Sequence, residues 1–79
     1  MTYLATFFSH FGAIRFRKRC EELGIEARTM PVPRSLSSSC GICTRFEADD
    51  WHDAGPVTEE MEKVVLITEK GYETLFSRD

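Results

Sequence analysis

Cysteine chemistry is the first possibility that this sequence raises, because Cys40 and Cys43 form a Cys-x-x-Cys pair at the end of a polar loop. Two prolines and a run of serines precede Cys40, and the prolines prevent a regular helix from continuing. The small residues Ser38, Ser39 and Gly41 allow backbone N–H groups to converge on an anion. The positive electrostatic field of these N–H groups also favours a thiolate at Cys40, so the loop predicts a nucleophilic sulfur.

Two arginines near the loop could hold an anion beside Cys40. The residues predicted to bind an anion or a cargo are therefore Arg34, Ser38, Ser39, Gly41 and Arg45. Cys43 could resolve a persulfidated or oxidised Cys40 by forming a disulfide. That pairing requires residues 40–43 to turn, because an extended span of about 10 Å exceeds the roughly 7 Å between Cα atoms that a disulfide allows.

Other interpretations of the cysteines stay open at this stage. Cys40 could be a structural residue at a tight turn, where cysteine behaves as a small hydrophobe. Cys40 and Cys43 could also supply half of a zinc site, completed by His10 and His52, but these histidines are isolated and we predict no metal site. Cys20 is expected in the core. No histidine is spaced beside Cys40 as a general base, and no carboxylate pair is set for acid–base catalysis, so the chain is not obviously an enzyme.

The composition argues against several classes of function. A net charge of -3 disfavours a nucleic-acid-binding protein, since phosphate neutralisation needs a surplus of Lys and Arg. No apolar run approaches the roughly 20 residues of a membrane span, and the N-terminus lacks the features of a signal peptide. Three cysteines in this spacing are not a secreted disulfide framework. We therefore expect one cytoplasmic domain over residues 1–79, without a cofactor and without nucleic-acid or membrane partners.

The elements that position the loop follow from the pattern of apolar residues. Four strands are expected, in short runs that are rich in β-branched and aromatic residues or that alternate in polarity. These strands are residues 3–8, 25–30, 43–48 and 72–77. Apolar residues at helical spacing predict one helix from Ser9 to about Leu23 and a second from about Val57 to Lys70. The order β-α-β-β-α-β predicts an α+β ferredoxin-like fold, a four-stranded antiparallel sheet with both helices on one face.

On residues 31–41 (PVPRSLSSSCG) and residues 45–46 (RF), the chain resembles the DUF3343 family of selenium/sulfur carrier-like proteins. The resemblance extends over most of the chain and implies a small ferredoxin-like domain in which Cys40 bears the chalcogen. Relatives commonly carry a small apolar residue in place of Cys43, so the Cys-x-x-Cys pair is not a hallmark of the family. The implied partners are proteins that mobilise sulfur or selenium, such as small sulfur-carrier proteins, cysteine desulfurases and selenophosphate synthase.

We therefore interpret the chain as a thiol-based sulfur or selenium carrier or delivery protein with Cys40 as its nucleophile. The alternative is a non-catalytic ferredoxin-like module that recognises a protein or a small anion through the Pro-Ser-Cys loop. The acidic stretch around Trp51 could dock a basic partner, while the acidic residues at positions 59, 60 and 62 are explained by the start of the second helix. A homodimer is also expected, because Phe7, Phe8 and Phe11 offer more apolar surface than a small domain buries.

Overall fold

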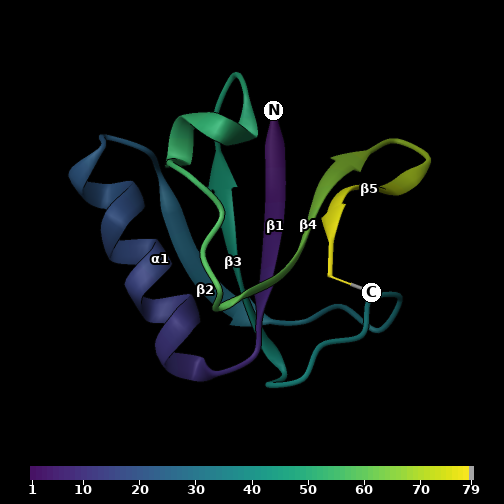
Figure 1. Ribbon diagram of the computed structural model, residues 1–79. Coiled ribbons are helices and arrows are strands. Elements are labelled where there is room, and N and C mark those ends of the chain that lie inside the picture. Colours follow the sequence, from purple (N-terminus) through teal and green to yellow (C-terminus); the bar gives the residue numbers. More distant parts are fainter. Residues whose placement is uncertain (79) are drawn as a thin grey trace.

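The computed structural model describes residues 1–78, in which one α-helix packs on a five-stranded antiparallel sheet (Figure 1). The elements in chain order are β1 (Thr2–Phe7), α1 (His10–Glu22), β2 (Ala27–Pro31), β3 (Ile42–Glu47), the 3₁₀ turn η1 (Trp51–Ala54), β4 (Met61–Thr68) and β5 (Gly71–Ser77). The strand order across the sheet is β2-β3-β1-β4-β5. Because β3 is antiparallel to both β1 and β2, these two strands run parallel to each other on either side of β3 and form a split β-α-β unit with α1.

Helix α1 begins and ends where its sequence predicts. The hydroxyl of Ser9 accepts a hydrogen bond from the Gly12 amide at 3.2 Å and so caps the first turn. Gly24 follows the helix with φ +76°, a conformation in which a Cβ would be strained. The apolar side chains that α1 buries are Ala13, Phe16 and Cys20.

Aromatic rings form the core between α1 and the sheet. Tyr3 of β1 stacks on Phe46 of β3 with 5.2 Å between ring centroids, and Phe16 of α1 meets Phe46 edge-on at 5.1 Å. Thr44 is fully buried here and donates its hydroxyl to the Ala13 carbonyl at 2.9 Å. A buried hydrogen bond therefore ties α1 to β3 in addition to the apolar contacts.

The opposite face of the sheet carries a second, smaller core, formed by Leu4, Cys43 and Val65. Each of these side chains is at most 1% exposed. The loop between β2 and β3 covers them, because its residues Val32 and Leu36 pack against this cluster. Apolar contacts therefore hold the loop on the sheet.

The prediction of a second helix is wrong, because residues 57–70 contain strand β4. Val64 and Val65 are neighbours in the sequence, and both are fully buried. Successive residues of a strand point to opposite faces, and both faces of this sheet are covered. Residues 64–68 are also rich in β-branched side chains, which favours a strand. Gly71, with φ +122°, begins β5 after a tight turn instead of ending a helix.

The predicted fold class is therefore correct in part. The structure is α+β and its sheet is antiparallel, but the described residues form one α-helix and five strands, not two helices and four strands. Residues 48–60, between β3 and β4, form an irregular segment with η1. Trp51 of this segment packs against the helix-side core, with its ring 6.4 Å from that of Phe76. No helix in residues 1–78 is both long and apolar enough to cross a membrane.

Candidate functional site

Cys40 lies at the end of the loop between β2 and β3 and is half-buried. Its Sγ is 3.4 Å from the carbonyl oxygen of Ile42, to which the thiol donates a weak hydrogen bond. The side chain also packs against the helix-side core. Gly41 follows with φ +79°, so the chain turns into β3 directly after Cys40. Cys40 is thus a partly accessible thiol on a tight turn.

His10, the first residue of α1, reaches the backbone of Cys40. Its Nε2 lies 2.9 Å from the Cys40 carbonyl oxygen, and Nε2 must carry the proton because a carbonyl only accepts. The sequence pointed to no general-base histidine beside Cys40, and this hydrogen bond goes to the backbone and not to the sulfur. The two residues are 30 positions apart in the sequence, so no local spacing could have revealed the contact.

Two of the serines predicted to bind an anion already donate hydrogen bonds within the protein. The amide and the hydroxyl of Ser39 both donate to the carboxylate of Glu62, at 3.2 and 2.8 Å. The hydroxyl of Ser38 donates to the Phe7 carbonyl at 3.5 Å. Glu62 belongs to β4, and sequence reasoning missed its contact with the loop because it placed this residue at a helix start. While Glu62 stays in place, its negative charge disfavours an anion at Ser39.

The two predicted arginines occupy different parts of the fold. Arg34 is exposed in the loop that carries Cys40, and no ion pair within residues 1–78 involves it. Arg45 lies three residues beyond Ile42 in β3, which is about 10 Å along the strand from the loop. Its guanidinium is 3.7 Å from the carboxylate of Glu47, which lies still farther along the strand. The structure therefore places Arg34 on the same loop as Cys40 and places Arg45 on the sheet.

The other two cysteines are fully buried. Cys20 is 0% exposed in the helix-side core, as predicted, and Cys43 is 0% exposed in the smaller core under the loop. Burial is the main reason that the pKa of each thiol is raised to about 11, and the neighbouring Cys40 also raises that of Cys43. All three cysteines are free thiols. Cys40 packs against the helix-side core and Cys43 belongs to the smaller core on the opposite face of the sheet. Burial in that core shields Cys43 from solvent.

Alkaline pH should destabilise the fold through Cys20 and Cys43. A cysteine thiol in an unfolded chain has a pKa of about 8.5, whereas the folded protein raises both pKa values to about 11. Between these values the unfolded state releases protons that the folded state keeps. The stabilising contribution of the two thiols is therefore complete below the pKa of the unfolded chain, and it is lost as the pH rises through the pKa of the folded protein. We expect the free energy of unfolding to fall by about 3 kcal/mol for each thiol over this range.

Urea denaturation at several pH values between about 8 and about 11 measures this loss. The Cys43→Ala variant should be less stable at neutral pH but should lose less stability over the alkaline range. Val64→Ala is the matched control, because it opens a cavity without removing a thiol, and it should keep the pH dependence of the wild type. An equal alkaline loss in Cys43→Ala and in the wild type would contradict this prediction.

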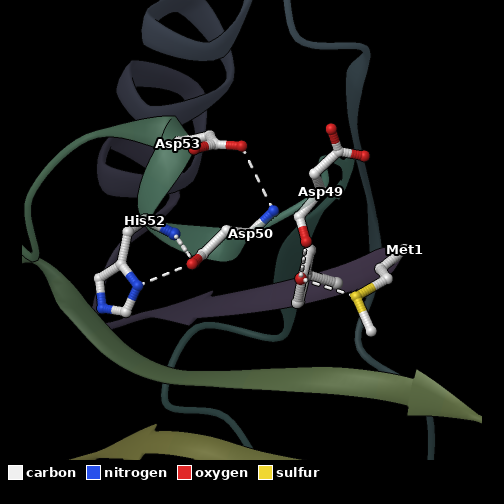
Figure 2. A network of polar contacts seen from close by, with 6 residues as sticks. Met1, Asp49, Asp50, His52 and Asp53 are labelled. Carbon is white, nitrogen blue, oxygen red and sulfur yellow. Dashed lines mark hydrogen bonds and ion pairs between the residues drawn. The ribbon is translucent and has the colours of Figure 1, made fainter.

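His52, the second histidine of the hypothetical zinc site, belongs to the acidic turn formed by residues 49–54 (Figure 2). Its backbone N–H and its Nδ1 contact the Asp50 carboxylate at 2.9 and 2.8 Å. Asp53 accepts a hydrogen bond from the Asp50 amide at 3.3 Å, which completes a capping box for η1. The hydrogen bonds from His52, mainly the one from its backbone, lower the pKa of Asp50. Within residues 1–78, no three His, Cys, Asp or Glu side chains form a cluster that could hold a metal ion.

Comparison with known proteins agrees with the resemblance carried by the loop. A family model described as "Putative Se/S carrier protein-like" matches residues 2–73. The matched range includes α1, the strands from β1 to β4 and the whole loop with Cys40. No curated protein and no solved structure matches the chain.

Proposed function

This chain belongs to the putative Se/S carrier protein-like family, the DUF3343 family, and we propose that its Cys40 carries a sulfane sulfur or selenium atom between other proteins. The contrast between Cys40 and the other cysteines supports this role. Cys20 and Cys43 are 0% exposed and have pKa values raised to about 11, whereas Cys40 is partly exposed on a turn. Because the thiolate is the nucleophile in sulfur transfer, Cys40 is the favoured candidate among the three.

Loading by this route moves one sulfur atom without a net change of oxidation state. The Cys40 thiolate attacks the outer sulfur of a donor persulfide, R–S–SH, so that a bond forms between Sγ and that sulfur. The donor S–S bond breaks, and the donor leaves as the thiolate R–S⁻ with the bonding electrons. In delivery, an acceptor thiolate attacks the outer sulfur and the Cys40 thiolate is released. A donor with an outer selenium atom, R–S–SeH, loads Cys40 by the same exchange.

The groups that hold the outer atom are part of this proposal, and the candidates are Arg34, Ser38, Ser39, Gly41 and Arg45. Their contacts in the structure make some of these residues better candidates than others. Ser39 must leave Glu62 before it can donate to an anion, and Ser38 must leave the Phe7 carbonyl. Gly41 directly follows Cys40 and Arg34 shares its loop, so these two residues are the better candidates.

Cys43 enters the proposal as a possible resolving thiol. It would attack Sγ of the loaded Cys40, form a disulfide with it and release the outer atom as sulfide or selenide. This reaction requires Cys43 to leave the small core under the loop, where it is 0% exposed. The carrier function itself does not require Cys43, since delivery by an acceptor thiolate uses Cys40 alone.

Cys40→Ser should abolish the uptake of sulfur. After incubation with glutathione persulfide, the wild type should gain the mass of one sulfur atom in intact-protein mass spectrometry, and Cys40→Ser should gain none. Cys43→Ala is the matched control and should load like the wild type.

Iodoacetamide should also alkylate Cys40 faster than Cys20 and Cys43, because burial and a raised pKa protect the latter two. Loading that survives in Cys40→Ser would exclude Cys40 as the carrier. A wild type that gains no sulfur and has an unreactive Cys40 would favour the binding module.

The proposed donors and acceptors are cytoplasmic proteins that mobilise sulfur or selenium: small sulfur carriers, cysteine desulfurases and selenophosphate synthase.

A homodimer is a further proposal, and the set of residues expected at its interface needs one correction. Phe7 is 1% exposed and belongs to the core, whereas Phe8 and Phe11 are 47% and 69% exposed. A dimer would therefore use Phe8 and Phe11, and sedimentation equilibrium would detect it.

A further inference from the structure

Two side chains from different elements hold the backbone around Cys40. His10, at the start of α1, donates from Nε2 to the Cys40 carbonyl at 2.9 Å. Glu62, in β4, accepts from the amide and the hydroxyl of Ser39, the residue before Cys40. The turn is therefore tied to the helix on one side of Cys40 and to the sheet on the other.

His10 is poorly explained by the needs of its own helix. Ser9 already caps the first turn of α1 through its hydrogen bond with Gly12. A histidine at the first helical position adds little helix propensity, and in its charged form it is unfavourable near the positive end of the helix dipole. Its one hydrogen bond in residues 1–78 instead reaches across 30 positions of sequence to Cys40. This points to a role at the loop.

Loading removes the hydrogen bond that the Cys40 thiol makes. In the unloaded protein, the S–H group donates to the Ile42 carbonyl, with Sγ at 3.4 Å from the oxygen. A thiolate has no such proton, and neither has a sulfur that is bonded to a second sulfur. The sulfur and the carbonyl oxygen then face each other as two electron-rich atoms, so the side chain must turn away from Ile42. The hydrogen bond from His10 goes to the backbone carbonyl and does not depend on this proton, so loading does not remove its donor or its acceptor.

We infer that His10 is a positioning residue for Cys40, a role that rests on the proposed carrier function. Its Nε2–H fixes the direction of the Cys40 carbonyl, and so holds the backbone from which Sγ projects toward a donor or acceptor. A nucleophile held in one geometry reacts faster than one that samples many, because less entropy is lost on reaching the transition state. His10 does not touch the sulfur and is not a catalytic residue.

Substitution of His10 by glutamine and by alanine tests this role. Glutamine carries an amide N–H donor at a reach similar to that of Nε2 but has no charge, whereas alanine has no donor. With glutathione persulfide as the donor, His10→Ala should load Cys40 about tenfold more slowly than the wild type, and His10→Gln should stay within about twofold of it. His52→Ala is the matched control, since His52 is an exposed histidine of the acidic turn, and it should load at the wild-type rate.

Amide hydrogen exchange in the unloaded protein measures the same hydrogen bond without any sulfur transfer. The amides of residues 40–42 should exchange faster in His10→Ala than in the wild type or His10→Gln, while those of β1 and β4 keep their protection. Equal exchange and equal loading in all variants would overturn the inference, and so would a glutamine variant that loads as slowly as the alanine variant. If the exchange responds as expected but the wild type takes up no sulfur, the carrier function fails and the hydrogen bond from His10 holds the loop for another purpose.

Discussion

Replacing Phe46 with alanine should destabilise the protein by about 4 kcal/mol. Phe46 is 1% exposed at the centre of the helix-side core, where its ring contacts Tyr3 from β1 and Phe16 from α1. The variant loses the buried area of the ring and both aromatic contacts, and it leaves a cavity between the sheet and the helix. A domain of this length has a total stability of roughly 4–12 kcal/mol, so much of the variant should be unfolded.

Urea denaturation followed by circular dichroism measures this effect. Phe11→Ala is the matched control, because Phe11 is 69% exposed on the same helix as Phe16. It removes the same atoms and should change the free energy of unfolding by no more than about 0.5 kcal/mol. Similar losses in the two variants would show that the aromatic core is not centred on Phe46.

The first half of the fold could be predicted because its signals are local. The capping serine, the apolar face of α1 and the terminal glycine act within a few residues of one another, and the structure has all three. The alternation of polarity also identified β2 and β3 as strands. It did not identify all of their buried side chains, because Cys43 and Thr44 are neighbours in β3 and both are fully buried, on opposite faces of the sheet.

The prediction for the second half of the chain failed because a strand that is buried on both faces loses its alternation of apolar and polar residues. Met61, Val64 and Val65 are all buried, and their spacing also fits one face of a helix. Periodicity alone cannot separate these structures, and the preference of Val64, Val65 and Ile67 for strands was the more informative signal. The coverage of the second face by the β2–β3 loop, which decides the outcome, is a tertiary feature that the spacing of residues 57–70 does not contain.

In the candidate site, too, local features could be predicted and long-range contacts could not. Cys40 could be found from its polar loop, because the loop is a local feature of the sequence. His10 and Glu62, which contact Cys40 and Ser39, were missed because each lies more than 20 residues away along the chain. The error in β4 also hid Glu62, since a carboxylate at a helix start needs no other partner, whereas in the strand it faces the loop.

Val65→Asp should be still more damaging than Phe46→Ala, with an expected loss above about 4 kcal/mol. Val65 is 0% exposed in the smaller core and lies directly opposite Leu4 in the β1–β4 pairing. An aspartate there would bury a carboxylate among Leu4, Cys43 and the loop residues Val32 and Leu36, where it must either stay charged without a partner or take up a proton. Thr74→Asp, at the exposed position that pairs with Val65 on β5, is the matched control and should change stability by no more than about 0.5 kcal/mol.

The milder variant Val65→Ala connects this core with the site, because the loop that covers Val65 also carries Cys40. It should cost about 2 kcal/mol, which a stable domain tolerates, and it weakens the apolar contacts that hold the loop on the sheet. Cys43 lies in the same cluster, so it should become accessible, and iodoacetamide should alkylate it faster than in the wild type. Cys20 is the internal reference, since it is buried on the other side of the sheet and should keep its slow rate. Equal acceleration at Cys20 and Cys43 would mean that the whole domain opens, whereas acceleration at Cys43 alone would show that the second core holds the loop with Cys40.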